Sequence, residues 1–301
     1  MPERKVIVTI APTGGMANKG MNPHLPTQPD EIAESVYRCW AAGASVVAVH
    51  ARRGDDLATC DPAVYSLTNS LIRERCDIVI NNSTGGGVSG DMIREFAPGR
   101  FEISFDERIK GVEAGAEMCT FDPQTLSVSM GETTLLNETS FKDCVRLAEA
   151  MRDHGVKPEW EVYSNSDLVA VERLIGMGFD EPPHYINIVL GTHKNFSGTL
   201  PYTPKILQRF VEDLPPNSVF GVSALGPAQL PGSVHGVLLG GHARVGLEDN
   251  LYYRQGELAT NEQLVERMVR ILRELNLSPA TPSEAREILG LKQLATVGAG
   301  Q

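Results

Sequence analysis

The segment GGHARVGLEDN, residues 240–250, gathers the side chains best suited to chemistry. Val245 and Leu247 alternate with Arg244, Gly246 and Glu248, the period-two pattern of a β-strand, which directs both charged side chains to one face. Asp249 follows where the strand gives way to a loop. Buried charge must be paired or bound to a metal, so this pattern favours a catalytic site. A structural alternative stays open, in which Arg244 and Glu248 form an ion pair and Asp249 caps a helix.

Polar side chains also end several other predicted strands. They are His50, Arg52, Arg53, Asn81, Asn82, Ser83, Thr120 and Glu161. Two glycine-rich loops, APTGG (11–15) and STGGG (83–87), follow the first and third strands, and their backbone N–H groups could approach an anion closely. Neither loop carries a dinucleotide or Walker pattern, and a tight turn is the alternative. Residues 16–29 carry no helix or strand signal, which is typical of a lid.

The elements that would position these residues alternate regularly. Eight predicted strands and eight predicted helices indicate a (β/α)8 TIM barrel, an α/β fold in one domain over 1–301 with a helical extension from about 278 to 301. An open doubly wound sheet is the alternative. The strands are predicted over 5–11, 45–51, 77–83, 116–121, 158–163, 185–191, 218–224 and 243–248. The helices are predicted over 29–43, 62–75, 90–96, 141–154, 167–177, 203–213, 227–239 and 261–276.

Composition excludes several classes of partner. The net charge of −11 argues against nucleic acid and anionic membranes, which attract basic surfaces. No apolar run approaches the roughly 20 residues of a membrane span. The five cysteines are an odd number without C-x-x-C spacing, so we expect reduced thiols and a cytoplasmic protein.

Taken together, these motifs resemble the β-keto acid cleavage enzyme family, also called the 3-keto-5-aminohexanoate cleavage enzyme family. The resemblance covers nearly the whole chain and rests on VTIAPTGG, NPHLPTQPDEIAES, AGASVVAVHAR, STGGG, PEWEVY, IVLG and above all GGHARVGLEDN. It implies a (β/α)8 barrel that binds zinc. It also implies a Claisen-type exchange between a β-keto acid and acetyl-CoA, which gives acetoacetate and a new acyl-CoA through a metal-stabilised enolate. A homo-oligomer, often a tetramer, is implied as well.

The resemblance also implies roles for individual residues. Asp249 matches the general base, Arg244 the arginine that orients it, and Glu161 a glutamate of the acetyl-CoA half-reaction. Glu248 and His50 match metal ligands. The substrate-binding positions are Ser83, Thr120 and two glycines of the STGGG loop, Gly85 and Gly86.

One ligand of the family pattern is missing. The family has His-x-His at the end of strand 2, whereas this chain reads Ala48-Val49-His50. Zinc normally takes three protein ligands and an open position, so the binding of Zn²⁺ or another divalent metal, and activity with it, is open; His24 is a candidate third ligand. Met16 stands where some members carry a glutamate for an amino substrate, which favours a non-amino β-keto acid. The alternatives are a metal-poor barrel lyase, isomerase or hydrolase without CoA, and a non-catalytic CoA or keto-acid binding protein.

Overall fold

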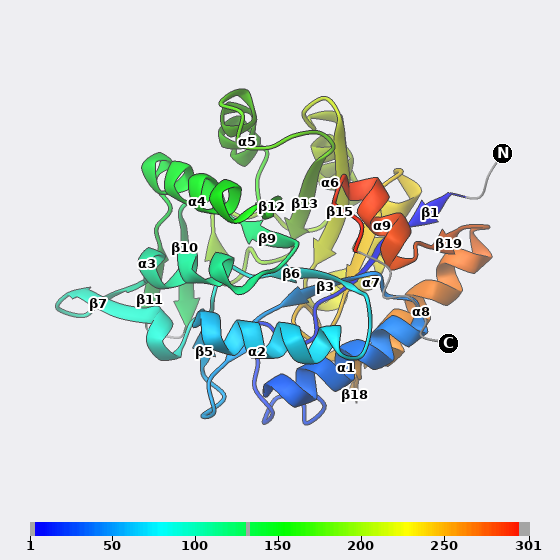
Figure 1. The fold of residues 1–301 in the computed structure, drawn as a ribbon, viewed down its shortest axis with the longest axis horizontal. Coiled ribbons are helices and arrows are strands. Elements are labelled where there is room, and N and C mark those ends of the chain that lie inside the picture. The colour runs from blue at the N-terminus through cyan, green and yellow to red at the C-terminus, as the bar shows by residue number, and fades with distance from the viewer. Residues whose placement is uncertain (1–3, 131–132, 295–301) are drawn as a thin grey trace.

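A closed barrel of eight parallel strands forms the centre of the molecule (Figure 1). The computed structural model describes residues 4–130 and 133–294. The strands pair in the order β12-β13-β15-β16-β2-β3-β6-β9, and the ring closes where β9 pairs with β12. Closure confirms the predicted (β/α)8 barrel and excludes the open sheet. We retain one domain over 1–301 as an interpretation.

The barrel strands agree with the predicted positions to within a few residues. They are β2 (Val8–Ile10), β3 (Val46–Val49), β6 (Val79–Asn82), β9 (Met118–Phe121), β12 (Lys157–Val162), β13 (His184–Leu190), β15 (Ser218–Ala224) and β16 (His242–Val245). Their near-continuous apolar runs are typical of strands buried on both faces.

A helix follows each barrel strand. In order these are α1 (Pro29–Ala42), α2 (Pro62–Arg73), α3 (Phe105–Arg108) with a 3-10 helix (Ile109–Ala114), α4 (Phe141–His154), α5 (Asp167–Gly176), α6 (Pro204–Glu212), α7 (Gln229–Leu238) and α8 (Asn261–Glu274). Helix α1 packs between α2 and α8 (Figure 1). Capping boxes begin α4 at Ser140 and α8 at Thr260, so sequence-local hydrogen bonds set these boundaries. Within the described ranges, no helix has the length and apolarity to span a bilayer.

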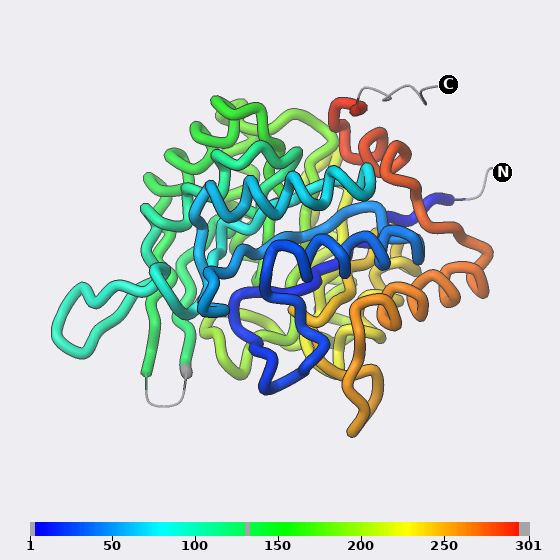
Figure 2. Tube along the Cα trace, turned by 60° about the horizontal axis from the view of Figure 1, so that its bottom comes forward, coloured from blue at the N-terminus to red at the C-terminus, as the bar shows by residue number. Residues whose placement is uncertain are grey.

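A second sheet of five strands covers one side of the barrel mouth, and the sequence did not predict it. Its order is β14 (Phe196–Ser197), β10 (Leu126–Met130), β11 (Thr133–Asn137), β8 (Arg100–Ile103) and β7 (Ile93–Ala97). The predicted helix over 90–96 is wrong, because this stretch is a 3-10 turn followed by β7. Figure 2 shows the β7–β8 hairpin projecting from the body of the molecule. Its strands are largely exposed, so they lack the clear apolar periodicity that identifies a strand.

The chain's last described helix closes the opposite end of the barrel. Strand β19 (Ser278–Pro279) pairs with β1 (Lys5–Val6), and α9 (Pro282–Leu289) follows. Ala285 and Leu289 of α9 pack against barrel residues such as Met118 and Tyr185. The predicted extension from 278 is therefore partly helical; residues 295–301 lie outside the described range.

Candidate active site

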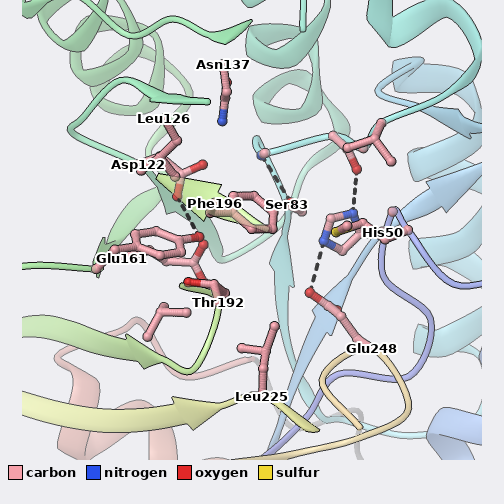
Figure 3. Close-up of a pocket in the computed structure, with 18 of the residues that line it drawn as sticks. His50, Ser83, Asp122, Leu126, Asn137, Glu161, Thr192, Phe196, Leu225 and Glu248 are labelled. Carbon is pink, nitrogen blue, oxygen red and sulfur yellow. Dashed lines mark hydrogen bonds and ion pairs between the residues drawn. The ribbon is translucent and has the colours of Figure 1, made fainter. Parts of the chain in front are cut away.

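A cavity opens at the C-terminal ends of the barrel strands, under the second sheet (Figure 3). Most of the predicted site residues line it: His50, Ser83, Gly85, Gly86, Glu161, Arg244, Glu248 and Asp249. These residues come from four barrel strands, β3, β6, β12 and β16, or the turns after them. The barrel thus brings together side chains that are up to about 200 positions apart in sequence.

Arg244 is the centre of the charged network. Its side chain is buried, and it donates hydrogen bonds to Glu161 Oε1 at 3.3 Å, to Glu248 Oε1 at 2.6 Å and to both oxygens of Asp249 at 2.9 Å. One guanidinium therefore holds three carboxylates around the cavity. A planar group with five donors is suited to this role, whereas an ammonium is not.

A turn, and not the predicted strand, orients the carboxylates of Glu248 and Asp249. Strand β16 ends at Val245, so the prediction of a strand through Glu248 is wrong. Gly246 adopts a φ of +147°, and a Cβ atom there would lie 2.0 Å from the carbonyl oxygen of Ala11. Only glycine permits this close approach. The turn brings Glu248 and Asp249 back over Arg244, so the predicted proximity is confirmed although its backbone cause differs.

Burial and neighbouring charges shift the pKa values of Glu248 and Asp249 in opposite directions. Burial alone would lower the pKa of Arg244, but Asp249, Glu248 and Glu161 hold it well above its usual value. Burial would raise the pKa of Glu248, yet Arg244 and His50 bring it down to about 2. The pKa of Asp249 is raised by burial, with Arg244 opposing the rise. Glu248 is therefore a fixed anion, while Asp249 is the more basic carboxylate and the better proton acceptor.

His50 lies opposite these carboxylates, with both ring nitrogens close to oxygen. Nδ1 is 2.7 Å from the carbonyl oxygen of Gly86, and Nε2 is 3.2 Å from Glu248 Oε1. The Nδ1 contact fixes the ring and turns Nε2 toward the cavity, as second contacts do for metal-binding histidines. Glu248 Oε2 is buried without a hydrogen-bond partner.

Two side chains that could bind a metal, His50 and Glu248, therefore converge, but a third metal ligand is missing. Ala48 on β3 has no donor, and His24 is exposed and outside the residues that line the cavity. Among residues 4–130 and 133–294, no group of three His, Cys, Asp or Glu side chains could hold a metal ion. The pair fits a divalent ion whose remaining ligands come from substrate or water. It does not fit a closed zinc site with three protein ligands.

The STGGG loop forms another wall of the cavity. Ser83 Oγ faces the cavity and accepts a hydrogen bond of 3.1 Å from the Gly85 N–H. Thr120 is not among the described residues that line the cavity. Its Oγ1 accepts a hydrogen bond of 3.0 Å from the Thr84 N–H, and its carbonyl accepts one from the Thr84 hydroxyl. The structure thus gives Thr120 the task of holding the loop.

Glu161 is buried at the end of β12, where it accepts a 3.1 Å hydrogen bond from Asn187. Burial, with the nearby Asp122 carboxylate, holds the pKa of Glu161 well above its usual value. Four polar residues of the cavity were missed from sequence: Asp122, Asn137, Tyr163 and Thr192. Asp122 follows strand β9 directly, so the strand-end rule could have identified it. Asn137 belongs to the unpredicted sheet and carried no signal.

The cysteines agree with the prediction of reduced thiols. All five cysteines are free and buried. His242 points away from the cavity, and its Nδ1 accepts a 3.0 Å hydrogen bond from the Ile7 N–H. Residues 16–28 form no helix or strand, as expected.

Comparisons with known proteins identify relatives of this chain. The chain is 34% identical to a 3-keto-5-aminohexanoate cleavage enzyme of Acetoanaerobium sticklandii, over 96% of this chain and 99% of the relative. It is 33% identical to a 3-dehydrocarnitine:acetyl-CoA trimethylamine transferase of Rhizobium meliloti, over 96% and 97%. The fold resembles that of ObcA in a binary complex with oxaloacetate, with a TM-score of 0.69, 18% identity, and 90% and 68% of the two chains covered. The model of the beta-keto acid cleavage enzyme family matches residues 5–291, and the chain therefore belongs to that family.

Proposed function

We propose that this protein cleaves a β-keto acid by acyl exchange with acetyl-CoA, giving acetoacetate and a new acyl-CoA. The observation that carries the proposal is the Arg244 network, in which one guanidinium presents Glu248 and Asp249 to a cavity opposite His50. The names of relatives that share most of their length with this chain support the use of acetyl-CoA.

The proposed reaction begins at the carbon between the keto and carboxylate groups. The Asp249 carboxylate takes a proton from this carbon, and the resulting enolate attacks the thioester carbon of acetyl-CoA. A carbon–carbon bond forms and the CoA thiolate leaves. The thiolate then attacks the original keto carbon, and the older carbon–carbon bond breaks. Acyl-CoA departs, and protonated Asp249 returns its proton to the acetoacetate carbon, so atoms and charge balance.

We assign the other cavity residues to supporting roles in this reaction. Arg244 orients Asp249 and offsets the negative charge that develops on the substrate. Ser83, with the backbone N–H groups of Gly85 and Gly86, binds the substrate carboxylate, and Thr120 supports their loop. Glu161, whose raised pKa favours the neutral acid, would donate a hydrogen bond in the acetyl-CoA half-reaction.

We also propose that His50 and Glu248 are the protein's ligands for a divalent metal, Zn²⁺ or another, that binds together with the substrate. When bound, such an ion would act as a Lewis acid on the keto oxygen. His50, fixed by Gly86, and the anionic Glu248 would orient the substrate's oxygens toward Arg244. We further propose a cytoplasmic homo-oligomer that binds neither nucleic acid nor membranes.

The test is to incubate the protein with acetyl-CoA, added divalent metal and a panel of β-keto acids. We expect acetoacetate and a matching acyl-CoA in equal amounts by mass spectrometry. Asp249→Asn should lower kcat/KM by about 100-fold or more, since it removes the base. Asp153→Asn, on the exposed surface of α4, is the matched control and should retain activity.

Two other outcomes would contradict the proposal. Turnover without acetyl-CoA, resistant to chelator, would favour a metal-poor lyase, isomerase or hydrolase. Binding of CoA or keto acids with no turnover, even in Ala48→His, would favour a non-catalytic binding protein.

A further inference from the structure

A polar patch lies across the cavity from the proposed catalytic residues. Figure 3 places Asp122, Asn137 and Leu126 on the wall opposite His50 and Glu248. Asp122 follows β9, whereas Asn137 and Leu126 belong to the second sheet, which is built from segments inserted between barrel elements. This wall is therefore the part of the cavity that the barrel core does not determine.

Asp122 has spare hydrogen-bonding capacity. The residue is 3% exposed. Its Oδ1 accepts one long hydrogen bond of 3.4 Å from the Tyr163 hydroxyl, and its Oδ2 forms an ion pair of 3.5 Å with Arg108 Nη2. Arg108 Nη2 itself has no hydrogen-bond partner. A Cβ atom at Gly85 would lie 3.4 Å from both Asp122 Oδ2 and Ser83 Oγ. The carboxylate therefore faces the same space as the glycine loop, where it can accept a hydrogen bond from a ligand.

Asn137 supplies a donor beside this acceptor. Its Oδ1 accepts a 2.5 Å hydrogen bond from Arg108 Nη1. Arg108 is fully buried and is itself held by the Thr84 carbonyl at 2.9 Å and by Thr139 Oγ1 at 2.9 Å. An arginine can only donate, so the Asn137 amide oxygen must face Arg108 and its nitrogen must face the cavity, as Figure 3 shows.

We propose that Asp122 and Asn137 form a specificity subsite for a neutral hydroxyl group on the acyl chain of the β-keto acid. A hydroxyl donates to the Asp122 carboxylate and accepts from the Asn137 amide, so it satisfies both groups at once. The Asp122 carboxylate would repel an anionic chain. An ammonium group on the chain has no lone pair, so it would leave the Asn137 donor without an acceptor. The inference rests on the proposed function, whose substrate it narrows.

The test compares acyl chains of matched length. The substrates are 3-oxohexanoate, its 4-, 5- and 6-hydroxy derivatives, 5-amino-3-oxohexanoate and 3-oxoadipate, each with acetyl-CoA. One hydroxy derivative should exceed 3-oxohexanoate in kcat/KM by about tenfold or more, because the plain chain displaces water from Asp122 and Asn137 without replacing its hydrogen bonds. The kcat/KM values of 5-amino-3-oxohexanoate and 3-oxoadipate should be lower than that of this hydroxy derivative. A preference for the plain, amino or dicarboxylate chain would overturn the inference.

Two variants separate this role from a structural one. Asn137→Asp keeps an acceptor for Arg108 but replaces the cavity donor, and Asp122→Asn keeps the shape but removes the charge. Each should reduce the hydroxy-to-plain ratio of kcat/KM about tenfold, mainly through KM for the hydroxy substrate. A ratio within one preparation does not depend on the fraction folded, so an unchanged ratio would contradict the subsite.

Failure of the proposed function would be seen separately. If no acid yields acyl-CoA, the reaction is wrong, and calorimetry with the same acids still decides the inference. The hydroxy acid must then bind about tenfold more tightly than 3-oxohexanoate, and equal affinities would overturn the subsite.

Discussion

The two ends of the barrel both bury charge, but they balance it differently. At the closed end, Glu117 accepts hydrogen bonds from Arg286 and Arg73, so two cations meet one anion. At the mouth, Arg244 alone holds Glu161, Glu248 and Asp249, so three carboxyl groups share one guanidinium. The closed end is covered by α9, whereas the mouth opens into the cavity of the candidate active site.

The difference separates structural charge from functional charge. Asp180, beside the closed end, is satisfied by Lys157 at 2.9 Å, Trp160 at 3.0 Å and His184 at 2.8 Å. In the described ranges, the buried charged atoms that lack a hydrogen-bond partner are Glu248 Oε2 and Arg108 Nη2, and both belong to the mouth or the wall beside it. Among charged side chains of the described ranges, unmet hydrogen-bonding capacity lies at the mouth and paired charges lie at the closed end, which indicates where a ligand completes the structure.

The largest expected effect comes from replacing the arginine at each end by lysine. Arg244→Lys keeps the charge but loses the planar donors that hold Asp249, so we expect kcat/KM to fall by about 1,000-fold. Arg286→Lys should instead lower the free energy of unfolding by about 2 kcal/mol and leave kcat/KM per folded protein within about threefold. Steady-state kinetics and urea denaturation of both variants measure the contrast.

Either of two results would contradict this division between structural and functional charge. If Arg286→Lys lost as much activity as Arg244→Lys, the closed end would also act on the reaction. If Arg244→Lys kept normal activity and lost only stability, the mouth network would be structural, which is the ion-pair alternative that the GGHARVGLEDN segment left open.

The sequence predicts the barrel and the residues at its strand ends, but not the second sheet or the turn after β16. The barrel was predictable because its strands are buried apolar runs between amphipathic helices, and strand-end residues converge by the geometry of the fold. The proximity of Arg244, Glu248 and Asp249 was predictable, but the turn at Gly246 was not, because it depends on a contact with Ala11 across the barrel. The second sheet could not be predicted, since strands such as β7 and β8 are exposed and pair across inserted segments. The subsite residue Asn137 was missed for the same reason.

Replacing Ala48 by histidine should supply the metal ligand that the mouth lacks. Ala48 lies on β3 two positions before His50, and it is buried next to Asn81 of the neighbouring strand. Ala48→His should raise zinc affinity at least tenfold, because a third protein ligand joins His50 and Glu248. Elemental analysis after dialysis should find about one zinc per chain in the variant and less in the natural protein. Ala48→Gln, of similar size without an imidazole, is the control.

The outcome would also show which protein groups bind the metal at the mouth. A full zinc complement in the natural protein would mean that an unforeseen group completes the site. Equal zinc in Ala48→His and Ala48→Gln would mean that residue 48 does not reach the metal position, and the two-ligand assignment would have to be revised.

The last prediction concerns the dependence of stability on pH at the closed end. His242 is buried there, and burial, aided by the charge of Arg4, lowers its pKa to about 3 from the ordinary 6.5. The folded protein therefore keeps His242 neutral where the unfolded chain binds a proton. The stability that it contributes is complete above pH 6.5 and is lost as the pH falls toward 3. At pH 5 the loss is about 2 kcal/mol, from about 1.5 pH units at about 1.4 kcal/mol each.

His242→Asn tests this directly, since the Asn oxygen can still accept from the Ile7 N–H and cannot take up a proton. Urea denaturation at pH 7.5 and pH 5 should show the natural protein losing about 2 kcal/mol more than the variant on acidification. His154→Asn, on the exposed end of α4, should retain the natural pH dependence. Parallel losses in the natural protein and in His242→Asn would mean that His242 does not stay neutral in the fold. The closed end would then hold an unbalanced charge, and full pairing would no longer distinguish it from the mouth.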